Sequence, residues 1–335
     1  MPQVTLRTLA EQLQLSPGTV SKALRDSYEI SEETKKKVLS LAKKMNYVPN
    51  AYASSLRKKK SNMIAVVLPE VADSFFSVCI NGIESIAQKK AYHVLIYLTH
   101  ENFLKEKSIL HDFKSGRVDG VLLSVTRETK NAEHISDLQS SGVPIVFFDR
   151  VLEEIETAKV CTDDFESGYL ATKHLIEKGC KNIAYLSISK DLAIANERMK
   201  GYEKALLDNK QQVKDNNLIA CTNDEEHNYE LIKKLLSQKA RPDGIVASVE
   251  KFIITLYQVC IELKLNIPKD LKIVGFSIFP SASILNPPIT TITQPAFEIG
   301  EAAAALLFKA LEKSSFDLKG KRIILPSTLT VRSST

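Results

Sequence analysis

Residues 16–25 carry small polar and cationic side chains that are suited to contacts with a nucleic acid. The ammonium group of Lys22 can donate hydrogen bonds to O6 and N7 of guanine. Pro17 offers only an apolar contact, such as one with a thymine methyl, and Gly18 has no side chain. We therefore expect sparse direct reading of bases and a large contribution from DNA shape. The residues suited to phosphates or to adjacent base edges are Ser16, Thr19, Ser21 and Arg25.

The first 60 residues hold a local excess of positive charge. They contain twelve Lys or Arg and five Asp or Glu, whereas the whole chain of 335 residues has a net charge of only +5. Charge that is so localised indicates a polyanion-binding segment joined to a nearly neutral body. Charge alone leaves open a small helical bundle with a solvated lysine face.

Helical spacing supplies the elements that would position these side chains. Thr5 is a candidate N-cap for a first helix, and Ser16 for a second helix with Pro17 at its first position. A third helix is expected from Ser31. Such an arrangement is a helix-turn-helix, whose second helix enters the major groove, and we assign it to residues 1–48. The exposed face of the third helix is expected to carry Lys35, Lys36, Lys37, Lys43 and Lys44.

A basic segment follows at residues 49–61 and is expected to form a hinge helix and linker. Pro49 would end the preceding helix, and Asn50 can cap a short new one. Ala53 and Leu56 would share one face of this helix, which ends in four consecutive cations. A single exposed leucine on a basic helix suits a wedge between base pairs in the minor groove. An ordinary basic linker with one incidental leucine is the alternative.

The body, residues 62–335, alternates apolar strands with amphipathic helices. Runs such as residues 63–68 and 245–247 are apolar enough for strands that are covered on both faces, which predicts parallel sheets. A second series of strands and helices starts after Val160, so two α/β lobes are expected. Ligands in such sheets bind at the carboxyl ends of the strands, here in a cleft between the lobes.

Several motifs in these segments belong together. They include Val4–Leu6, Thr19–Leu24, Ile30–Ser31, Asn46–Asn50, Val118–Gly120, Phe148–Arg150, Arg241–Asp243 and Pro288–Pro295. With these motifs the chain resembles, over nearly its whole length, the lactose-repressor (LacI) family of bacterial transcription regulators. The resemblance implies that residues 16–25 hold the recognition helix and that residues 50–56 form the hinge helix, with Leu56 as the intercalating wedge. The residues expected to bind DNA are Thr5, Ser16, Pro17, Gly18, Thr19, Ser21, Lys22, Arg25, Asn50, Ala53 and Leu56.

The resemblance also implies a body like the periplasmic sugar-binding proteins, in which the chain crosses between the lobes about three times. We expect these crossings near residues 160, 290 and 323. The N-lobe would then comprise about 62–160 and 291–322, and the C-lobe about 161–290 and 323–335. Most of the matching body residues are expected to be structural, and His174 to be a satisfied helix residue rather than a ligand.

A set of effector-binding residues follows from the same resemblance. In this family the stretch after the first strand helps to line the cleft, and aromatic rings there can stack on a sugar or a base. Arg198 occupies the position of the family's effector-binding arginine, and its guanidinium suits hydroxyls or a carboxylate. The alternatives are core packing for Phe75 and Phe76, and an interlobe salt bridge for Asp149 and Arg150. The full set is Ser74, Phe75, Phe76, Asp149, Arg150, Arg198, Ser248, Val249, Phe276 and Ser277.

Two positions depart from the family pattern. The family usually carries a polar pair ending in Asp where this chain has Ser248 and Val249, with Glu250 next, and often an Asp where this chain has Ser277. Losing two carboxylates should weaken polyol binding, because each buried ligand hydroxyl needs a partner. The effector is then less polar than a free sugar, or anionic and held by Arg198. Two alternatives stay open: the pocket responds to a protein partner, or it responds to no effector at all.

The remaining features mainly exclude other functions. The sequence has no signal peptide and no apolar run long enough to span a membrane. Its five cysteines lack a CxxC pair, its six histidines lack metal spacing, and no nucleophile or phosphate-loop motif occurs. We therefore expect no enzyme, no metal and no cofactor. A solute-binding protein without a role in gene control is the weaker alternative, because the head is basic and no signal peptide is present.

The expected function is thus that of a cytoplasmic, sequence-specific transcription regulator, and a repressor is favoured over an activator. It would bind a palindromic operator in double-stranded DNA as a homodimer, because no leucine-rich heptad tail follows Arg332. A small-molecule effector in the interlobe cleft, such as a sugar, a sugar derivative or another metabolite, would modulate this binding. No membrane partner is expected.

Overall fold

A computed structural model gives the architecture of the chain. It describes residues 4–47, 60–72, 74–188, 192–222, 224–313 and 315–335. The chain divides into two compact units, residues 1–60 and 61–335, which are treated separately below. Asn50, Ala53 and Leu56, the residues expected in the hinge helix, lie outside the described residues.

Over residues 4–47, the part of it that the structure describes, the first unit contains three short helices, α1 (Leu6–Leu13), α2 (Pro17–Ala23) and α3 (Glu32–Lys44). Each begins at a hydroxyl cap: Thr5 Oγ1 accepts from the Thr8 backbone N at 3.2 Å, and the Ser16 and Ser31 hydroxyls act in the same way. Leu9, Val20 and Val38 bring one residue of each helix into a small apolar core. The expected helix-turn-helix head is therefore present.

One lysine of α3 does not lie where the sequence pattern placed it. Lys35 was expected on the exposed face, but it is buried, and its Nζ lies 2.7 Å from both Asp26 Oδ1 and Glu32 Oε1. A lysine can be buried when carboxylates compensate its charge. The partner Asp26 belongs to the turn after α2, so the pairing depends on the tertiary packing of that turn.

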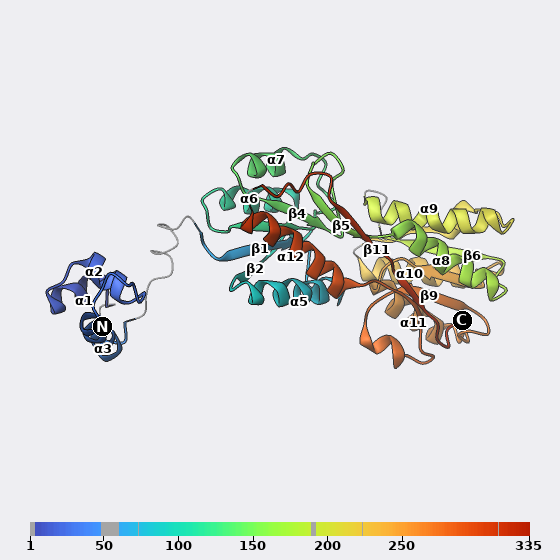
Figure 1. Ribbon diagram of the computed structural model, residues 1–335. Helices are drawn as coiled ribbons and strands as arrows, with labels where there is room; N and C mark the ends of the chain where they lie inside the picture. Colours follow the sequence, from blue (N-terminus) through green and yellow to red (C-terminus); the bar gives the residue numbers. More distant parts are fainter. Residues whose placement is uncertain (1–3, 48–59, 73, 189–191, 223, 314) are drawn as a thin grey trace. The chain divides into compact units, whose positions relative to one another are not determined.

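The second unit contains two six-stranded sheets (Figure 1). The first has the order β11-β5-β4-β3-β1-β2, and all its neighbouring strands are parallel. Helices α5 and α12 pack on one face of this sheet, and α6 and α7 on the other. We call this the N-lobe. Its elements are β1 (Met63–Leu68), α5 (Ser74–Lys89), β2 (His93–Leu98), α6 (Phe103–Phe113), β3 (Gly120–Leu123), α7 (Glu133–Ser140), β4 (Ile145–Phe148), β5 (Ala158–Thr162), α12 (Ala296–Glu312) and β11 (Arg322–Leu325).

The second sheet has the order β12-β10-β9-β8-β6-β7 and is parallel except for β12, which pairs antiparallel with β10. Helices α8 and α9 cover one face, and α10 and α11 the other. We call this the C-lobe. Its elements are α8 (Asp164–Glu177), β6 (Ile183–Ser187), α9 (Ala193–Asp208), β7 (Leu218–Ala220), α10 (Glu225–Leu236), β8 (Gly244–Ala247), α11 (Lys251–Glu262), β9 (Lys272–Phe276), β10 (Thr290–Thr293) and β12 (Thr328–Thr330).

The chain crosses between the two sheets three times: after β5, after β10 and after β11. These crossings lie a few residues later than the positions 160, 290 and 323 expected from the sequence. Thr290–Thr293 pairs with β9 and therefore belongs to the C-lobe, while residues up to Thr162 and Leu325 belong to the N-lobe. Strand pairing decides these limits, because an apolar run has the same composition whichever sheet it joins.

Two pairs of helices approach each other closely at glycines. A Cβ on Gly300 of α12 would lie 2.1 Å from the carbonyl oxygen of Cys79 on α5. In the C-lobe, a Cβ on Gly168 of α8 would lie 2.0 Å from the carbonyl oxygen of Arg198 on α9. Glycine is therefore the residue that permits each contact. The second contact fixes the backbone of Arg198, an expected site residue.

Among the residues that the structure describes, none of the helices combines the length and apolarity needed to cross a membrane.

Candidate functional site

A small cavity of about 50 Å³ lies between the N-lobe and the C-lobe, at the carboxyl ends of their strands. Most of the expected effector residues meet there: Phe75, Phe76, Asp149, Arg150, Arg198, Val249, Phe276 and Ser277 line it. The two others contact lining residues, because Ser74 Oγ donates to Glu250 and the Ser248 carbonyl oxygen accepts from Arg198. The tertiary structure thus collects the expected residues from five separate segments around one volume.

Several residues that line the small cavity were not expected from the sequence. Ile194, Ile278 and Gln294 also face the small cavity, as does Glu250, which the sequence analysis had noted only as the neighbour of Val249. Gln294 lies inside the 288–295 motif and follows β10 directly, so its place at a strand end was an available signal. Ile194 and Ile278 offered no such signal.

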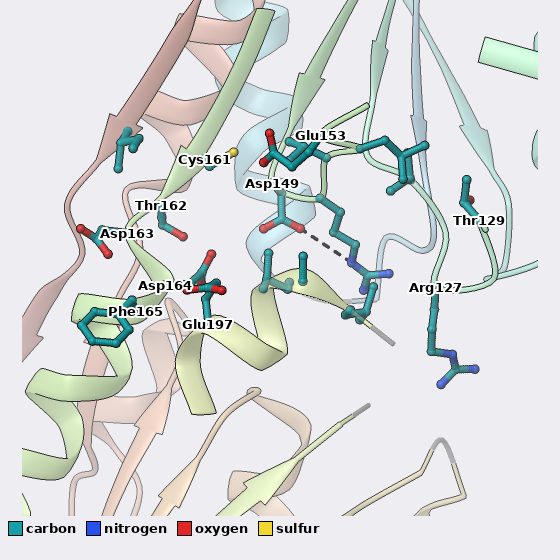
Figure 2. Close-up of a pocket in the computed structure, with 18 of the residues that line it drawn as sticks. Arg127, Thr129, Asp149, Glu153, Cys161, Thr162, Asp163, Asp164, Phe165 and Glu197 are labelled. Atoms are coloured by element: carbon teal, nitrogen blue, oxygen red, sulfur yellow. Dashed lines mark ion pairs between the residues drawn. The ribbon is translucent and has the colours of Figure 1, made fainter. Parts of the chain in front are cut away.

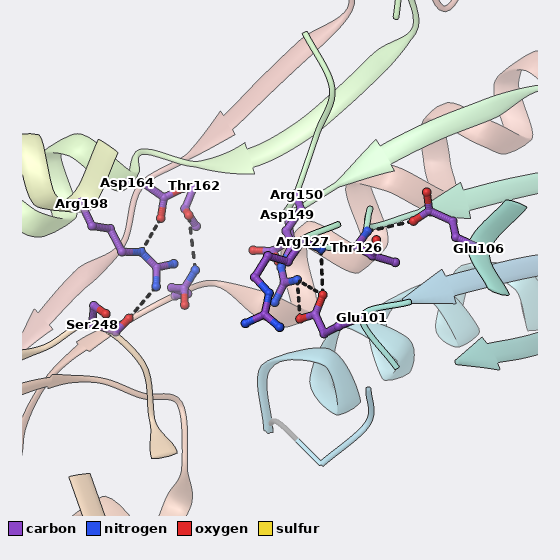
Figure 3. A network of polar contacts seen from close by, with 11 residues as sticks. Glu101, Glu106, Thr126, Arg127, Asp149, Arg150, Thr162, Asp164, Arg198 and Ser248 are labelled. Atoms are coloured by element: carbon purple, nitrogen blue, oxygen red, sulfur yellow. Dashed lines mark hydrogen bonds and ion pairs between the residues drawn. The ribbon is translucent and has the colours of Figure 1, made fainter. Parts of the chain in front are cut away.

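Arg198 on α9 is the most constrained of these side chains. It is 4% exposed, its Nε donates to Asp164 Oδ1 at 2.7 Å, and its Nη1 donates to the Ser248 carbonyl oxygen at 2.8 Å (Figure 3). Its guanidinium carbon also lies 4.4 Å from the centre of the Phe276 ring. Burial disfavours the charged form, but the Asp164 carboxylate outweighs it and raises the pKa of Arg198 above its usual range. Arg198 is therefore a fixed cation whose charge is already compensated.

Asp149 and Arg150 follow β4 on the N-lobe side of the cavity. Arg150 Nη1 donates to Glu101 Oε1 at 2.8 Å, and Arg150 Nε lies 3.9 Å from Asp149 Oδ2 (Figure 3). The alternative of an interlobe salt bridge is wrong for Arg150, since Glu101 follows β2 in the same lobe. Asp149 has a φ of +59°, which is uncommon outside glycine and marks a constrained turn.

Phe75 and Phe76 lie in the first turn of helix α5 and are 7% and 3% exposed. Their ring centres lie 5.5 Å apart in an edge-to-face arrangement, and Phe76 makes a similar contact with Phe148. The two rings therefore belong to the N-lobe core and also line the small cavity.

A second, larger cavity has a volume of about 460 Å³ and shares Asp149, Arg150 and Ile194 with the small one. Figure 2 shows the residues that line this larger cavity. Its lining comes from both lobes: residues 125–129, the segment after β4, the start of α8, the start of α9, and β11. Its volume falls within the range of small-molecule sites, about 300–1,000 Å³. Of the residues that line this cavity, Asp149 and Arg150 are the two that belong to the effector-binding set expected from the sequence.

Buried Glu106 holds one wall of the large cavity. Its carboxylate accepts from the Thr126 backbone N and from Thr129 Oγ1, each at 2.8 Å, and contacts His134 Nε2 at 2.8 Å. The loop at residues 125–129 is therefore anchored to α6 and α7. Within the described ranges, no group of three or more His, Cys, Asp or Glu is arranged to hold a metal ion.

The expected DNA-reading residues lie on and around α2. Pro17, Gly18, Lys22 and Arg25 are exposed, whereas Thr19 and Ser21 are half-buried. Arg25 Nη2 donates to Ser21 Oγ at 2.9 Å, and Lys22 forms an ion pair with Glu29. Thr5 and Ser16 serve as helix caps, so each hydroxyl already has a partner. Lys22 of α2 and Arg25, which follows α2, are thus held in place by contacts within the first unit.

Comparison with known proteins gives two family matches. Residues 5–50 match the family described as bacterial regulatory proteins of the lacI family, and residues 61–329 match periplasmic binding proteins and the sugar-binding domain of the LacI family. The chain is 30% identical over 331 residues to the ribose operon repressor of Halalkalibacterium halodurans, covering 99% of this chain and 97% of that protein.

Two solved structures show the likeness in three dimensions. The lac repressor dimer, bound to operator and the anti-inducer ONPF, matches with a TM-score of 0.84 at 22% identity, covering 99% of each chain. A LacI-family regulator from Enterococcus faecium with bound ribose matches with a TM-score of 0.73 at 26% identity. That match covers 82% of this chain and 98% of the other.

Proposed function

This chain belongs to the LacI family of bacterial regulatory proteins and is a DNA-binding transcription regulator, not an enzyme, and from that premise we propose how it works. It represses genes by binding a palindromic operator in double-stranded DNA as a homodimer, in the bacterial cytoplasm. A small-molecule effector between the lobes controls this binding. Residues 1–48 bind DNA, residues 49–61 form the hinge, and residues 62–335 bind the effector and the second protomer.

The observation that carries effector control is that both lobes line the same cavities. Phe76 and Arg150 come from the N-lobe, whereas Arg198 and Phe276 come from the C-lobe. A ligand that contacts both lobes binds the closed and open arrangements with different affinity, and such a difference shifts the population of states. The cavities therefore suit a switch that acts on the hinge and the DNA-binding head.

The proposed effector class is a sugar, a sugar derivative or a related metabolite. A relative of this chain is named a ribose operon repressor, and the regulator from Enterococcus faecium holds ribose. The polar residues around the small cavity, among them Asp149, Arg198, Glu250 and Ser277, are of the kinds that bind hydroxyl groups.

The proposed operator contacts keep the roles expected from the sequence. Lys22 reads guanine, while Ser16, Thr19, Ser21 and Arg25 contact phosphates or adjacent base edges. Lys22→Ala should therefore relax base preference at one operator position; equal weakening on all sequences would remove the direct-readout role.

Leu56 is the proposed minor-groove wedge, and Leu56→Ala should lower specific affinity far more than nonspecific affinity. Equal losses on both DNAs would contradict the wedge.

The test of the whole proposal is a search for the operator. Genomic footprinting with the full chain should recover discrete sites, and a salt titration should then compare binding to such a site with binding to random DNA. We expect a clear preference for the site at physiological salt. Binding without any preference would contradict the proposed function, and the genes beside the recovered sites would nominate the effector.

A further inference from the structure

Glu250 connects the two lobes across the small cavity. Its Oε2 accepts a hydrogen bond from Ser74 Oγ at 2.7 Å and another from Ser277 Oγ at 2.6 Å. Ser74 is the first residue of α5 in the N-lobe, whereas Ser277 follows β9 in the C-lobe. One carboxylate oxygen therefore joins hydroxyl donors from opposite sides of the cleft.

The position of Glu250 revises the meaning of Val249 and Ser277. These residues replace family carboxylates, and the sequence analysis inferred a pocket short of acceptors for ligand hydroxyls. In the structure, the longer side chain of Glu250 brings a carboxylate to Ser277 from one residue further along the chain. The pocket thus retains an acidic group that can accept hydrogen bonds from hydroxyl or ammonium donors.

The charges around the small cavity favour one class of ligand. Its two cations already have carboxylate partners, because Arg198 pairs with Asp164 and Arg150 pairs with Glu101. Two further carboxylates, those of Asp149 and Glu250, also line the cavity. Carboxylates therefore outnumber cations when the ion-pair partners are included, and an anionic ligand would be repelled.

The residues that line the large cavity also carry more negative than positive charge. Its cations are Arg127, Arg150 and Arg322, and Arg322 pairs with Glu153. More carboxylates than cations face the same volume. These carboxylates are Asp149, Glu153, Asp163, Asp164 and Glu197.

We propose that Glu250 is the specificity-determining residue of the effector site, and that the effector is a neutral or cationic molecule with hydroxyl or ammonium donors. The inference rests on the proposed function, in which these cavities bind the effector. Without effector, Glu250 ties Ser74 to Ser277 and keeps the small cavity at about 50 Å³, far below the space of a sugar ring. The effector's donors replace the Ser74 hydroxyl at this carboxylate, which couples ligand binding to the contact between lobes.

Calorimetric titration of the full-length protein tests the ligand class. The probes are D-glucose and D-ribose (neutral), D-glucosamine (cationic) and glucose 6-phosphate (anionic). We expect binding by at least one neutral or cationic sugar and none by the phosphate. Glu250→Gln should weaken that binding about tenfold or more, because it replaces an ionised acceptor by a neutral one.

The matched control is Glu230→Gln, which removes one carboxylate from an exposed position of α10 in the same lobe. It should leave sugar affinity unchanged. Tighter binding of glucose 6-phosphate than of the neutral sugars, binding by none of the neutral and cationic sugars, or equal effects of the two substitutions would overturn the proposal.

A second measurement needs no ligand. Amide hydrogen exchange over residues 74–80 and 248–253 should be faster in Glu250→Gln than in Glu230→Gln, because the tie between lobes is weakened. Unchanged exchange would contradict the tie. Operator binding measured on the same samples distinguishes failure of the proposed role of Glu250 from failure of the proposed function. An anionic effector that alters operator affinity overturns the role of Glu250 but leaves the proposed function standing, whereas loss of operator preference in the wild-type protein overturns the function.

Discussion

Arg198 Nε donates a hydrogen bond to Asp164 Oδ1 at 2.7 Å, and both side chains are almost completely buried. Asp164 is the first residue of α8 and Arg198 the sixth of α9, and Gly168 permits the close approach of the two helices. Arg198 is also the residue that holds the Ser248 carbonyl oxygen and the Phe276 ring in place. The ion pair therefore positions one whole side of the small cavity.

Arg198→Ala should destabilise the second unit strongly. It leaves Asp164 buried without its cation, and breaking a buried pair in this way costs about 3–5 kcal/mol of unfolding free energy. Arg198→Met combined with Asp164→Leu should lose much less, because no charge is left buried. Urea unfolding provides the measurement. Arg241→Ala is the control, since Arg241 is partly exposed and lies 4.0 Å from Asp270. Similar losses for Arg198→Ala and Arg241→Ala would contradict the structural role of the pair.

Gly300→Ala should separate α12 from α5. The added methyl group would lie 2.1 Å from the Cys79 carbonyl oxygen, and such overpacking costs about 1–3 kcal/mol. Gly18→Ala is the contrasting variant, since Gly18 is also helical but a Cβ there meets only Ser16 Oγ at 3.7 Å. It should leave the first unit as stable or slightly more so. Thermal unfolding of each variant gives the change in stability. An unchanged melting temperature for Gly300→Ala would mean that α12 and α5 can move apart freely.

The stability of the C-lobe should fall as the solution is acidified through the titration range of His174. Burial lowers the pKa of His174 below its usual value of 6.5, and its Nε2 lies 2.9 Å from Thr335 Oγ1. Below pH 6.5 the unfolded chain binds more protons at this site than the folded chain, so the contribution to stability is present above that pH and is lost below it.

His174→Gln should remove this part of the pH dependence of the unfolding free energy. Urea unfolding between about pH 5 and pH 8, a range that spans the usual titration of histidine, measures the change. His227→Gln, at an exposed position of α10, is the control. An unchanged slope in His174→Gln would assign the pH dependence to other groups.

Glu29→Gln should raise the affinity of the head for DNA. Lys22 and Glu29 form an exposed ion pair, so phosphates or bases must compete with the Glu29 carboxylate for the Lys22 ammonium. Removing one negative charge from this surface should strengthen binding to specific and random DNA alike, most clearly at low salt. Fluorescence anisotropy provides the affinities. Glu225→Gln in the second unit is the control, and weaker binding by Glu29→Gln would indicate that Glu29 itself contacts the DNA.

Ile261→Asp should weaken the proposed homodimer. Ile254 and Ile261 lie seven residues apart on one side of α11 and are 45% and 77% exposed, which suits burial against a second protomer. Sedimentation analysis should show more monomer, with a matching loss of operator affinity. Leu104→Asp, at a 72% exposed leucine of α6, is the control. Equal behaviour of the two variants would place the interface elsewhere.

The order of elements was readable from the sequence because its causes are local. Ser16 and Pro17 mark the start of α2, and apolar runs mark the central strands of both sheets, such as β1 and β8. Strand limits at the lobe crossings were less accessible, since Thr290–Thr293 joins the C-lobe through hydrogen bonds to β9 and β12. Pairing between distant segments leaves no mark in local composition.

The basic head, the two α/β lobes and the residue types that gather at the cleft could be predicted from local sequence patterns. The partners of those residues depend on tertiary packing: Asp164 for Arg198, Glu101 for Arg150, and Ser74 with Ser277 for Glu250. These contacts join residues up to 176 positions apart, and their geometry is set by how helices and strands pack. The charge of the cleft follows from such pairings, so residue identity alone could not settle which ligand it favours.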